Sequence, residues 1–322
     1  MDLKARAEEL LGRSLNSLKV VEDTSQFMDL GMGDVLHLEG RYLVLRGMTY
    51  EGRFGLDEEP KYWVRTGYDL ADGSAKIIKM VFFEEFDLPV GGLMIHCYRS
   101  PRKEQRVLDT VRGHRLFMQG ETLFDRAHNP VRVIDRIKGG PLHRRLDGLS
   151  QDHRAYYHGH LPRILDRFIA SVEAIGFLHS HQLVHGDIRR DHIFLETDTG
   201  LWRWIDFDYN YSLPQNPFGL DLFGLGNVLC YLVGRGIPTL HQLKRERPEA
   251  LERLDTGDLS LVIPNRVFNL RKLYPYIPEA LNRVLLHFAA SAPVFYEQVP
   301  EFLADLREAA AQVARDSQEV AP

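Results

Sequence analysis

The chain has 322 residues, of which 44% are hydrophobic, so it can bury the core of one large two-lobed domain or of two ordinary domains. Its formal charge of −5 gives no general attraction to nucleic acid or to anionic membranes, and we expect no nucleic-acid partner. Two cysteines, Cys97 and Cys230, are too few for a disulfide framework and suit a reducing compartment.

The N-terminal sequence has the spacing of an amphipathic helix over residues 2–15, in place of a charged leader followed by an apolar run. No stretch of about 18 residues is apolar without charges. We therefore expect no membrane span and a cytoplasmic protein.

The first third of the chain predicts an antiparallel sheet. Residues 42–45 and 61–65 are rich in aromatic and branched side chains, as strands are, and a glycine-bearing loop lies between them. Residues 69–74 (DLADGS) have the composition of a tight turn, and the apolar run over residues 75–82 predicts the next strand.

The pattern then changes to that of a helix, which is expected to begin at Pro101. Its apolar residues recur at three-to-four spacing: Val107, Leu108 and Val111. Two further strands are expected over residues 121–124 and 131–137. The sequence KGGP at 138–141 breaks the pattern and predicts a hinge.

The second half of the chain is predicted to be mostly helical. A long helix is expected over residues 158–182, followed by short strands at 193–195 and 202–205 and by helices from residue 221 to about 315. We therefore expect three parts. They are an N-terminal helical extension (1–35), a sheet-based lobe with one main helix (36–138), and a larger, mostly helical lobe (139–322).

The stretch that indicates chemistry is VHGDIRRDHIFL at 184–195, followed by WIDFD at 204–208. These segments resemble the catalytic loop H-R-D-x-x-x-x-N and the metal-binding D-F-G of the protein-kinase superfamily, and the chain is similar to an atypical bacterial serine/threonine protein kinase. The likeness extends over about residues 40 to 312. It implies an α+β, bilobal protein-kinase-like fold, with ATP and Mg²⁺ or Mn²⁺ as cofactors.

The resemblance assigns roles in the larger lobe. Asp187 corresponds to the catalytic base that accepts or orients the substrate hydroxyl, and Arg189 to a cation that contacts the transferred phosphate. Asp206 corresponds to the metal ligand, since coordination removes the penalty of a buried carboxylate. The alternatives are a surface loop aspartate for Asp187 and a solvated loop cation for Arg189.

The resemblance also assigns nucleotide-binding residues in the smaller lobe. Lys79 corresponds to the strand lysine that holds the α- and β-phosphates, with Lys76 as a competing candidate. Glu104 corresponds to the helix glutamate that pairs with that lysine, or is an exposed glutamate at a helix start. Gly52 and Gly55 correspond to the second and third glycines of a phosphate-cradling loop, and a plain turn is the alternative.

Two further residues fit the family pattern as structural supports. Asp221, in GLDLFGLG at 219–226, is similar to the aspartate that braces the catalytic-loop backbone, and it can also cap its helix. His185 is expected to stack beneath Phe207, as its equivalent does in the family.

Three positions depart from the family pattern. His192 replaces the asparagine that holds a second metal, and a neutral imidazole prefers softer ions than Mg²⁺. Asp208 replaces the glycine of D-F-G and adds a second carboxylate beside Asp206, so either one metal suffices, or Mn²⁺ is favoured, or Asp208 substitutes as a metal ligand. Gly186 replaces the arginine that reads a phosphorylated activation loop in the family.

The segment between the two motifs is short. Only residues 207–220 separate Asp206 from Asp221, and no A-P-E sequence lies in that span. We therefore expect a constitutively arranged segment that is not gated by phosphorylation. Short segments and H-G-D loops also resemble those of small-molecule kinases, including aminoglycoside phosphotransferases and lipopolysaccharide kinases.

Three functions follow from the resemblance. The first is phosphoryl transfer to a serine or threonine hydroxyl of a protein substrate. The second is transfer to an alcohol group of a small molecule or glycan. The third is a nucleotide-binding or inactive pseudokinase scaffold, which the replacements at His192 and Asp208 favour.

Overall fold

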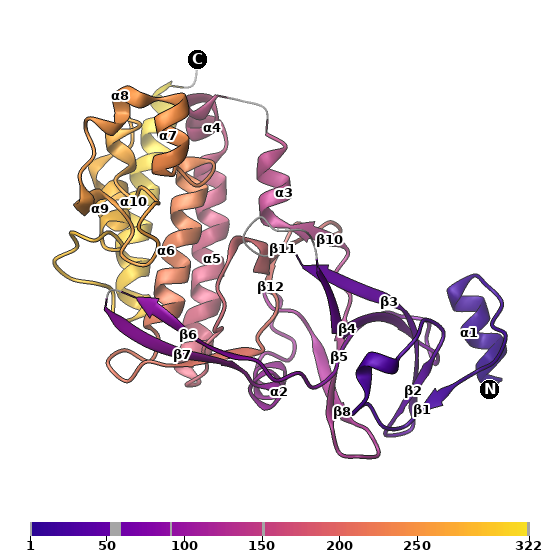
Figure 1. The fold of residues 1–322 in the computed structure, drawn as a ribbon. Coiled ribbons are helices and arrows are strands. Elements are labelled where there is room, and N and C mark those ends of the chain that lie inside the picture. The colour runs from indigo at the N-terminus through magenta and orange to yellow at the C-terminus, as the bar shows by residue number, and fades with distance from the viewer. Residues whose placement is uncertain (1, 52–58, 91, 150–151, 321–322) are drawn as a thin grey trace. The chain divides into compact units, whose positions relative to one another are not determined.

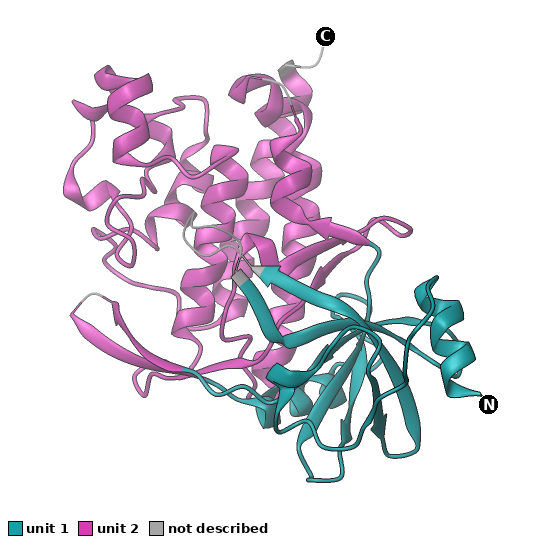
Figure 2. Cartoon of the chain, turned by 45° about the vertical axis from the view of Figure 1, so that its right-hand side comes forward, with its two compact units in different colours: residues 1–84, 99–138 teal, residues 85–98, 139–322 magenta. Residues whose placement is uncertain are grey.

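The computed structural model describes residues 2–51, 59–90, 92–149 and 152–320. The chain folds into two compact units (Figure 2). Unit 1 comprises residues 1–84 and 99–138, and unit 2 comprises residues 85–98 and 139–322. The observed division after residue 138 and the expected hinge lie at the same place in the chain.

Unit 1 is built on a seven-stranded sheet with the order β1-β2-β3-β4-β5-β9-β8 (Figure 1). Its strands are β1 (Val20–Val21), β2 (Val35–Leu38), β3 (Arg41–Glu51), β4 (Glu59–Asp69), β5 (Ala75–Lys79), β8 (Gly120–Phe124) and β9 (Pro130–Asp135). All neighbouring strands are antiparallel except β1 and β2, which run parallel. The expected antiparallel sheet is therefore present, with β1 added at its edge.

Two helices accompany this sheet. α1 (Leu3–Leu11) buries Ala7 against Val35, Val44 and Leu70. α2 (Pro101–Thr110) contacts β8 and β9. α2 begins where it does because Ser100 Oγ accepts the backbone N–H of Lys103, and Pro101 occupies the first turn, where a missing N–H is tolerated.

Unit 2 is mainly helical. Its helices are α3 (Leu142–Asp147), α4 (His153–Gly159), α5 (Leu161–Ser180), α6 (Gly219–Gly234), α7 (Leu240–Glu246), α8 (Pro248–Leu251), α9 (Glu279–Leu286) and α10 (Val299–Val320). α10 packs against α4, α5 and α9, and α5 also packs against α6 (Figure 1). The apolar residues expected along residues 158–182 form the buried face of α5, including Ile164, Phe168 and Val172.

Unit 2 also contains two three-stranded sheets. The first has the order β10-β11-β12, formed by β10 (Gly139–Pro141), β11 (Ile193–Glu196) and β12 (Trp202–Trp204). The second has the order β13-β7-β6, formed by β6 (Glu85–Val90), β7 (Leu93–Arg99) and β13 (Tyr209–Ser212).

The expected domain organisation was wrong for residues 85–98. The sequence placed them in the lobe over residues 36–138, but the β6–β7 hairpin belongs to unit 2 (Figure 2). The physical reason is burial, because Val90, Ile95 and Cys97 form a core cluster with Tyr211. The backbone of β7 is also hydrogen-bonded to β13.

Other boundaries differ from expectation in smaller ways. The helix expected over residues 158–182 is divided between α4 and α5 at His160, whose φ of −124° is not helical. The expected hinge contributes β10, which pairs with β11. The N-terminal extension over residues 1–35 is not only helical, because it supplies β1 to the sheet of unit 1.

Both cysteines are buried thiols that form no disulfide. Burial raises the pKa of Cys97 to about 11 and that of Cys230 to about 12, so both are unreactive at neutral pH. Within the described part of the chain, no helix is both long enough and apolar enough to cross a bilayer.

Candidate functional site

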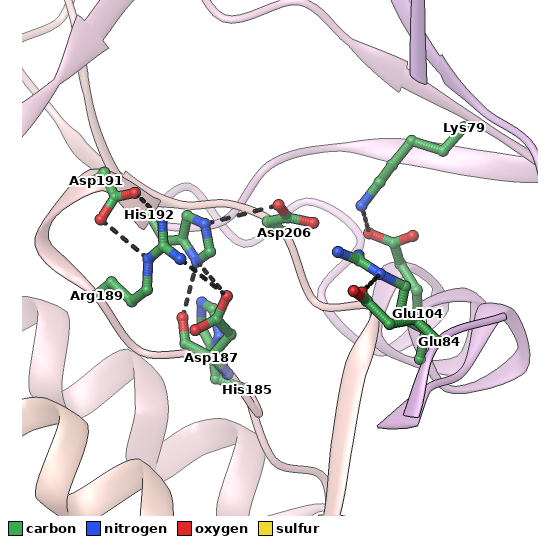
Figure 3. A network of polar contacts seen from close by, with 10 residues as sticks. Lys79, Glu84, Glu104, His185, Asp187, Arg189, Asp191, His192 and Asp206 are labelled. Atoms are coloured by element: carbon green, nitrogen blue, oxygen red, sulfur yellow. Dashed lines mark hydrogen bonds and ion pairs between the residues drawn. The ribbon is translucent and has the colours of Figure 1, made fainter. Parts of the chain in front are cut away.

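In unit 1, the predicted pairing of Lys79 with Glu104 is present (Figure 3). Lys79 Nζ, at the end of β5, donates to Glu104 Oε1 at 2.7 Å, and the two side chains are 6% and 0% exposed. Lys76, the competing candidate, pairs with Asp135 instead. Glu104 is therefore not an exposed glutamate at a helix start.

Arg132 is a third member of this cluster, which sequence reasoning missed. It lies opposite Lys79 in the β5–β9 register, and its Nε donates to Glu104 Oε2 at 3.1 Å. The two oxygens of Glu104 thus each accept from one cation. The remaining nitrogens of Arg132 donate to the carbonyls of Pro130 and Met80.

We expect Arg132→Met to lower the free energy of unfolding by about 3 kcal/mol, because it leaves one buried carboxylate oxygen and two carbonyls without this donor. Urea denaturation followed by circular dichroism measures this loss. Arg132→Lys should recover part of it. Arg112→Met is the matched control, because Arg112 is 69% exposed and its ion pair with Asp109 is local and exposed. Equal effects of Arg132→Met and Arg112→Met would contradict the assignment.

In unit 2, Asp221 braces the backbone that leads to Asp187. Its carboxylate, 1% exposed, accepts the amides of His185 at 2.7 Å and Gly186 at 2.9 Å, and also contacts His179 Nε2 at 3.0 Å. Burial opposes ionisation, but the hydrogen bond and charge of His179 lower the pKa of Asp221 below its ordinary value. The bracing role expected from the sequence is thus present in the geometry.

Gly186 has a structural reason to be glycine. Its φ of 88° lies in the left-handed region, and a Cβ at this position would stand 2.0 Å from the carbonyl oxygen of Tyr209. The arginine of H-R-D could not occupy this backbone conformation. The loss of the phosphate-reading arginine is therefore coupled to the close approach of β13.

Asp187, His192 and Asp206 lie together (Figure 3). His192 Nδ1 donates to the carbonyl oxygen of Asp187 at 2.8 Å and lies 3.5 Å from its carboxylate. His192 Nε2 lies 3.6 Å from a carboxylate oxygen of Asp206. Since Nδ1 donates to this carbonyl, the neutral form of the ring would present its Nε2 lone pair toward Asp206, and the protonated form would present an N–H there.

This arrangement has the chemistry of a cation site. A lone pair and a carboxylate that face each other can share a divalent ion, and the mixed nitrogen and oxygen set suits Mn²⁺ better than it suits Mg²⁺. Asp206 has a φ of 68°, a left-handed conformation that is uncommon for aspartate. Strained backbone of this kind is concentrated at functional sites.

The carboxyl of Asp187 is 23% exposed. Burial raises its pKa above the ordinary value, while His192 and Arg189 act in the opposite direction. A carboxylate with a raised pKa is a stronger base than an ordinary aspartate. Asp187 is therefore suited to accept a proton.

Arg189 lies beside Asp187, with Nη1 3.9 Å from the Asp187 carboxylate. It forms a bidentate ion pair with Asp191, a residue that sequence reasoning did not select. Although burial opposes ionisation, the hydrogen bond from Arg189 helps to lower the pKa of Asp191 to about 2. Arg189 is thus oriented by a fixed partner and is not simply a solvated cation. The ion pair could have been predicted from the sequence, because Arg189 and Asp191 are only two residues apart.

Phe207 and His185 form the support below these groups. Both side chains are 0% exposed, and their ring centroids lie 4.7 Å apart at an interplanar angle of 56°. The rings are therefore in contact but tilted, and not stacked as expected. Asp208 is 2% exposed and lies directly before β13. Among the described residues, no three histidine, cysteine or acidic side chains are grouped so as to hold a metal ion. That Asp208 joins Asp206 and His192 as a metal ligand stays a prediction.

The two glycines assigned to the phosphate loop, Gly52 and Gly55, lie outside the described residues. β3 and β4, the strands on either side of them, pair up to Glu51 and Glu59. The role of this loop remains a prediction from the sequence.

No protein-family model matches the chain, and no curated protein matches it in sequence. Many solved structures resemble it, among them the kinase domain of PknI from Mycobacterium tuberculosis. That domain is 15% identical, with a TM-score of 0.51, and the match covers 87% of this chain and 99% of the PknI chain. This similarity, together with the sheet of unit 1 and the helices of unit 2, shows that the chain has an α+β, bilobal protein-kinase-like fold.

Proposed function

We propose that the protein is a metal-dependent kinase that transfers the terminal phosphoryl group of ATP to an alcohol. The observation that carries this proposal is the position of His192, whose two ring nitrogens face the carboxylates of Asp187 and Asp206. Phosphoryl transfer requires one carboxylate for the acceptor hydroxyl and one for the metal, and both are present within one small region of unit 2.

Each residue has a distinct part in this proposal. Asp187 accepts the proton of the attacking hydroxyl, and its raised pKa suits that task. Arg189 contacts the transferred phosphate. Asp206 and the Nε2 atom of His192 hold Mg²⁺ or Mn²⁺, which neutralises charge on the phosphate oxygens when it is bound. Asp208 is a further candidate ligand, and Asp208→Ala should reduce metal-dependent turnover if it takes part.

Unit 1 supplies the nucleotide-binding residues in this proposal. Lys79, held by Glu104, binds the α- and β-phosphates, and Arg132 binds the other oxygen of Glu104. Gly52 and Gly55 contribute backbone amides to the phosphates.

The acceptor that we propose is a serine or threonine hydroxyl of a protein. The short segment after Asp206, together with Gly186 in place of arginine, gives an arrangement that needs no activating phosphorylation. The same short segment lacks an A-P-E sequence for docking a peptide, and this favours a small-molecule or glycan alcohol as the second candidate.

Thermal denaturation with ATP, in the presence and absence of Mg²⁺ or Mn²⁺, tests the nucleotide site. A ligand at about 100 times its Kd adds about 2.7 kcal/mol to the free energy of unfolding, so Tm should rise only when both ATP and metal are present. Asp206→Asn should remove the metal-dependent part of this rise. The control is Asp166→Asn, an exposed carboxylate on α5. If metal and ATP leave Tm unchanged, an inactive scaffold is the better account.

Labelled ATP then distinguishes the acceptors. Transfer of the γ-phosphate to the protein itself or to a generic basic protein supports a protein acceptor. ATP hydrolysis without protein labelling supports a small-molecule acceptor, which is the second candidate.

A further inference from the structure

The β6–β7 hairpin lies between Lys79 and Glu104 in sequence, yet it belongs to unit 2. We infer that this hairpin positions the catalytic loop by holding the segment that follows Asp206. The inference rests on the function proposed above. It assigns positioning roles to Phe86 and Tyr98, which lie outside the motifs that resemble a kinase.

The first observation is that the hairpin and β13 form one sheet. β7 is the central strand and is hydrogen-bonded to β6 on one side and to β13 on the other. The inner face of this sheet is a buried cluster that joins Val90, Ile95 and Cys97 to Tyr211 of β13. β13 begins only three residues after Asp206. The hairpin therefore fixes the backbone directly after the proposed metal ligand.

Two side-chain contacts extend this attachment. Tyr98 Oη accepts a hydrogen bond from Asn210 Nδ2 at 2.8 Å. The rings of Phe86 and Tyr209 meet edge to face with centroids 5.8 Å apart. Tyr209 and Asn210 are consecutive residues of β13, so the hairpin contacts both faces of that strand.

A second set of contacts joins β13 to the catalytic loop. The carbonyl of Tyr209 packs so closely on Gly186 that a Cβ there would stand 2.0 Å from it. Tyr211 Oη accepts from the backbone amide of Asp221 at 3.4 Å. The carboxylate of Asp221 in turn binds the amides of His185 and Gly186, directly before Asp187. A continuous path therefore leads from the hairpin to the proposed base.

This path accounts for the absence of an arginine at position 186. In the family pattern, a phosphorylated residue and an arginine order the activation segment through charge-assisted contacts. Here, strand pairing and apolar burial order the corresponding segment with no added charge. The hairpin supplies the ordering in a permanent form, within the same chain.

The double variant Phe86→Ala/Tyr98→Phe tests the inference. It removes the ring contact with Tyr209 and the acceptor for Asn210, and it leaves Lys79, Asp187 and Asp206 unchanged. Three quantities are measured: amide hydrogen exchange of residues 209–213, kcat of ATP turnover, and the Kd of ATP. The matched control is Met94→Ala, because Met94 lies on β7 and is 65% exposed.

We expect the variant to raise exchange at residues 209–213 and to lower kcat about tenfold, since a small displacement of a reacting group costs up to about a hundredfold. The Kd of ATP should stay within about twofold, because the variant leaves Lys79 and Glu104 unchanged. The single variant Phe86→Tyr retains both the ring and Tyr98. Its kcat should therefore equal that of the wild type. Met94→Ala should match the wild type in all three measurements.

Unchanged exchange in the double variant would overturn the inference, and so would an equal loss of kcat in Met94→Ala. If the double variant does not fold, the same three quantities are measured for Tyr98→Phe, which removes only the hydroxyl that accepts the hydrogen bond from Asn210. A wild type without turnover would refute the proposed function, but the exchange measurement would still decide whether the hairpin orders β13.

Discussion

Asp187→Asn should reduce phosphoryl transfer by about 10²- to 10⁴-fold, the usual contribution of a positioned general base. The amide has nearly the shape of the carboxylate, and the carbonyl of residue 187 can still accept from His192 Nδ1. The Kd of ATP should therefore change little. Single-turnover transfer of labelled γ-phosphate measures the first quantity, and nucleotide titration measures the second.

The stability of this variant provides an independent check. Burial raises the pKa of Asp187, so the ionised carboxylate is less favourable in the folded state than in the unfolded chain. The neutral amide removes this cost, and Tm at pH 7 should be equal to or above that of the wild type. Asp166→Asn on α5 serves as the control for a changed surface charge. Wild-type transfer by Asp187→Asn would remove Asp187 from the mechanism.

Gly186→Ala should lower the free energy of unfolding by about 3–5 kcal/mol, a large effect for one methyl group. Two costs combine in this variant. A left-handed backbone costs an ordinary residue about 1–2 kcal/mol. The added Cβ must also displace the carbonyl of Tyr209, and this moves β13 away from the catalytic loop. Transfer activity should fall with stability. Chemical denaturation and turnover assays measure the two effects.

Gly200→Ala separates these two costs. Gly200 has a φ of 69°, but nothing lies within 4 Å of the position that its Cβ would occupy. This control should therefore show only the backbone cost of about 1–2 kcal/mol and keep wild-type activity. Gly186→Arg, which restores the residue of the family pattern, should be at least as harmful as Gly186→Ala. Equal losses in Gly186→Ala and Gly200→Ala would show that β13 does not press on the loop.

The sequence identified those parts of the fold that depend on local pattern. The strands of unit 1 follow from branched and aromatic residues, and α2 follows from Pro101 and an apolar helical face. The catalytic loop was recognised because its polar residues occur at fixed short spacing. Such signals lie within about a dozen residues, so a single sequence reveals them.

The parts that were missed depend on contacts distant in sequence. Residues 85–98 were assigned to the lobe over residues 36–138, because the partner of the hairpin, β13, lies more than a hundred residues later and has only four residues. Arg132 was missed for the same reason, since it meets Glu104 only when β9 lies beside β5. Gly186 was taken as the loss of an arginine, whereas the structure shows a glycine that the approach of Tyr209 requires.

The central claim is that Asp187 and Asp206 act on the terminal phosphate of one metal-bound nucleotide. A crystal structure with Mn²⁺ and a nonhydrolysable ATP analogue, with the ion located by anomalous scattering, tests this claim most directly. We predict an anomalous peak within bonding distance of the Asp206 carboxylate and a terminal phosphate next to Asp187. A peak distant from Asp206, or a nucleotide with its phosphates away from both carboxylates, would contradict the claim.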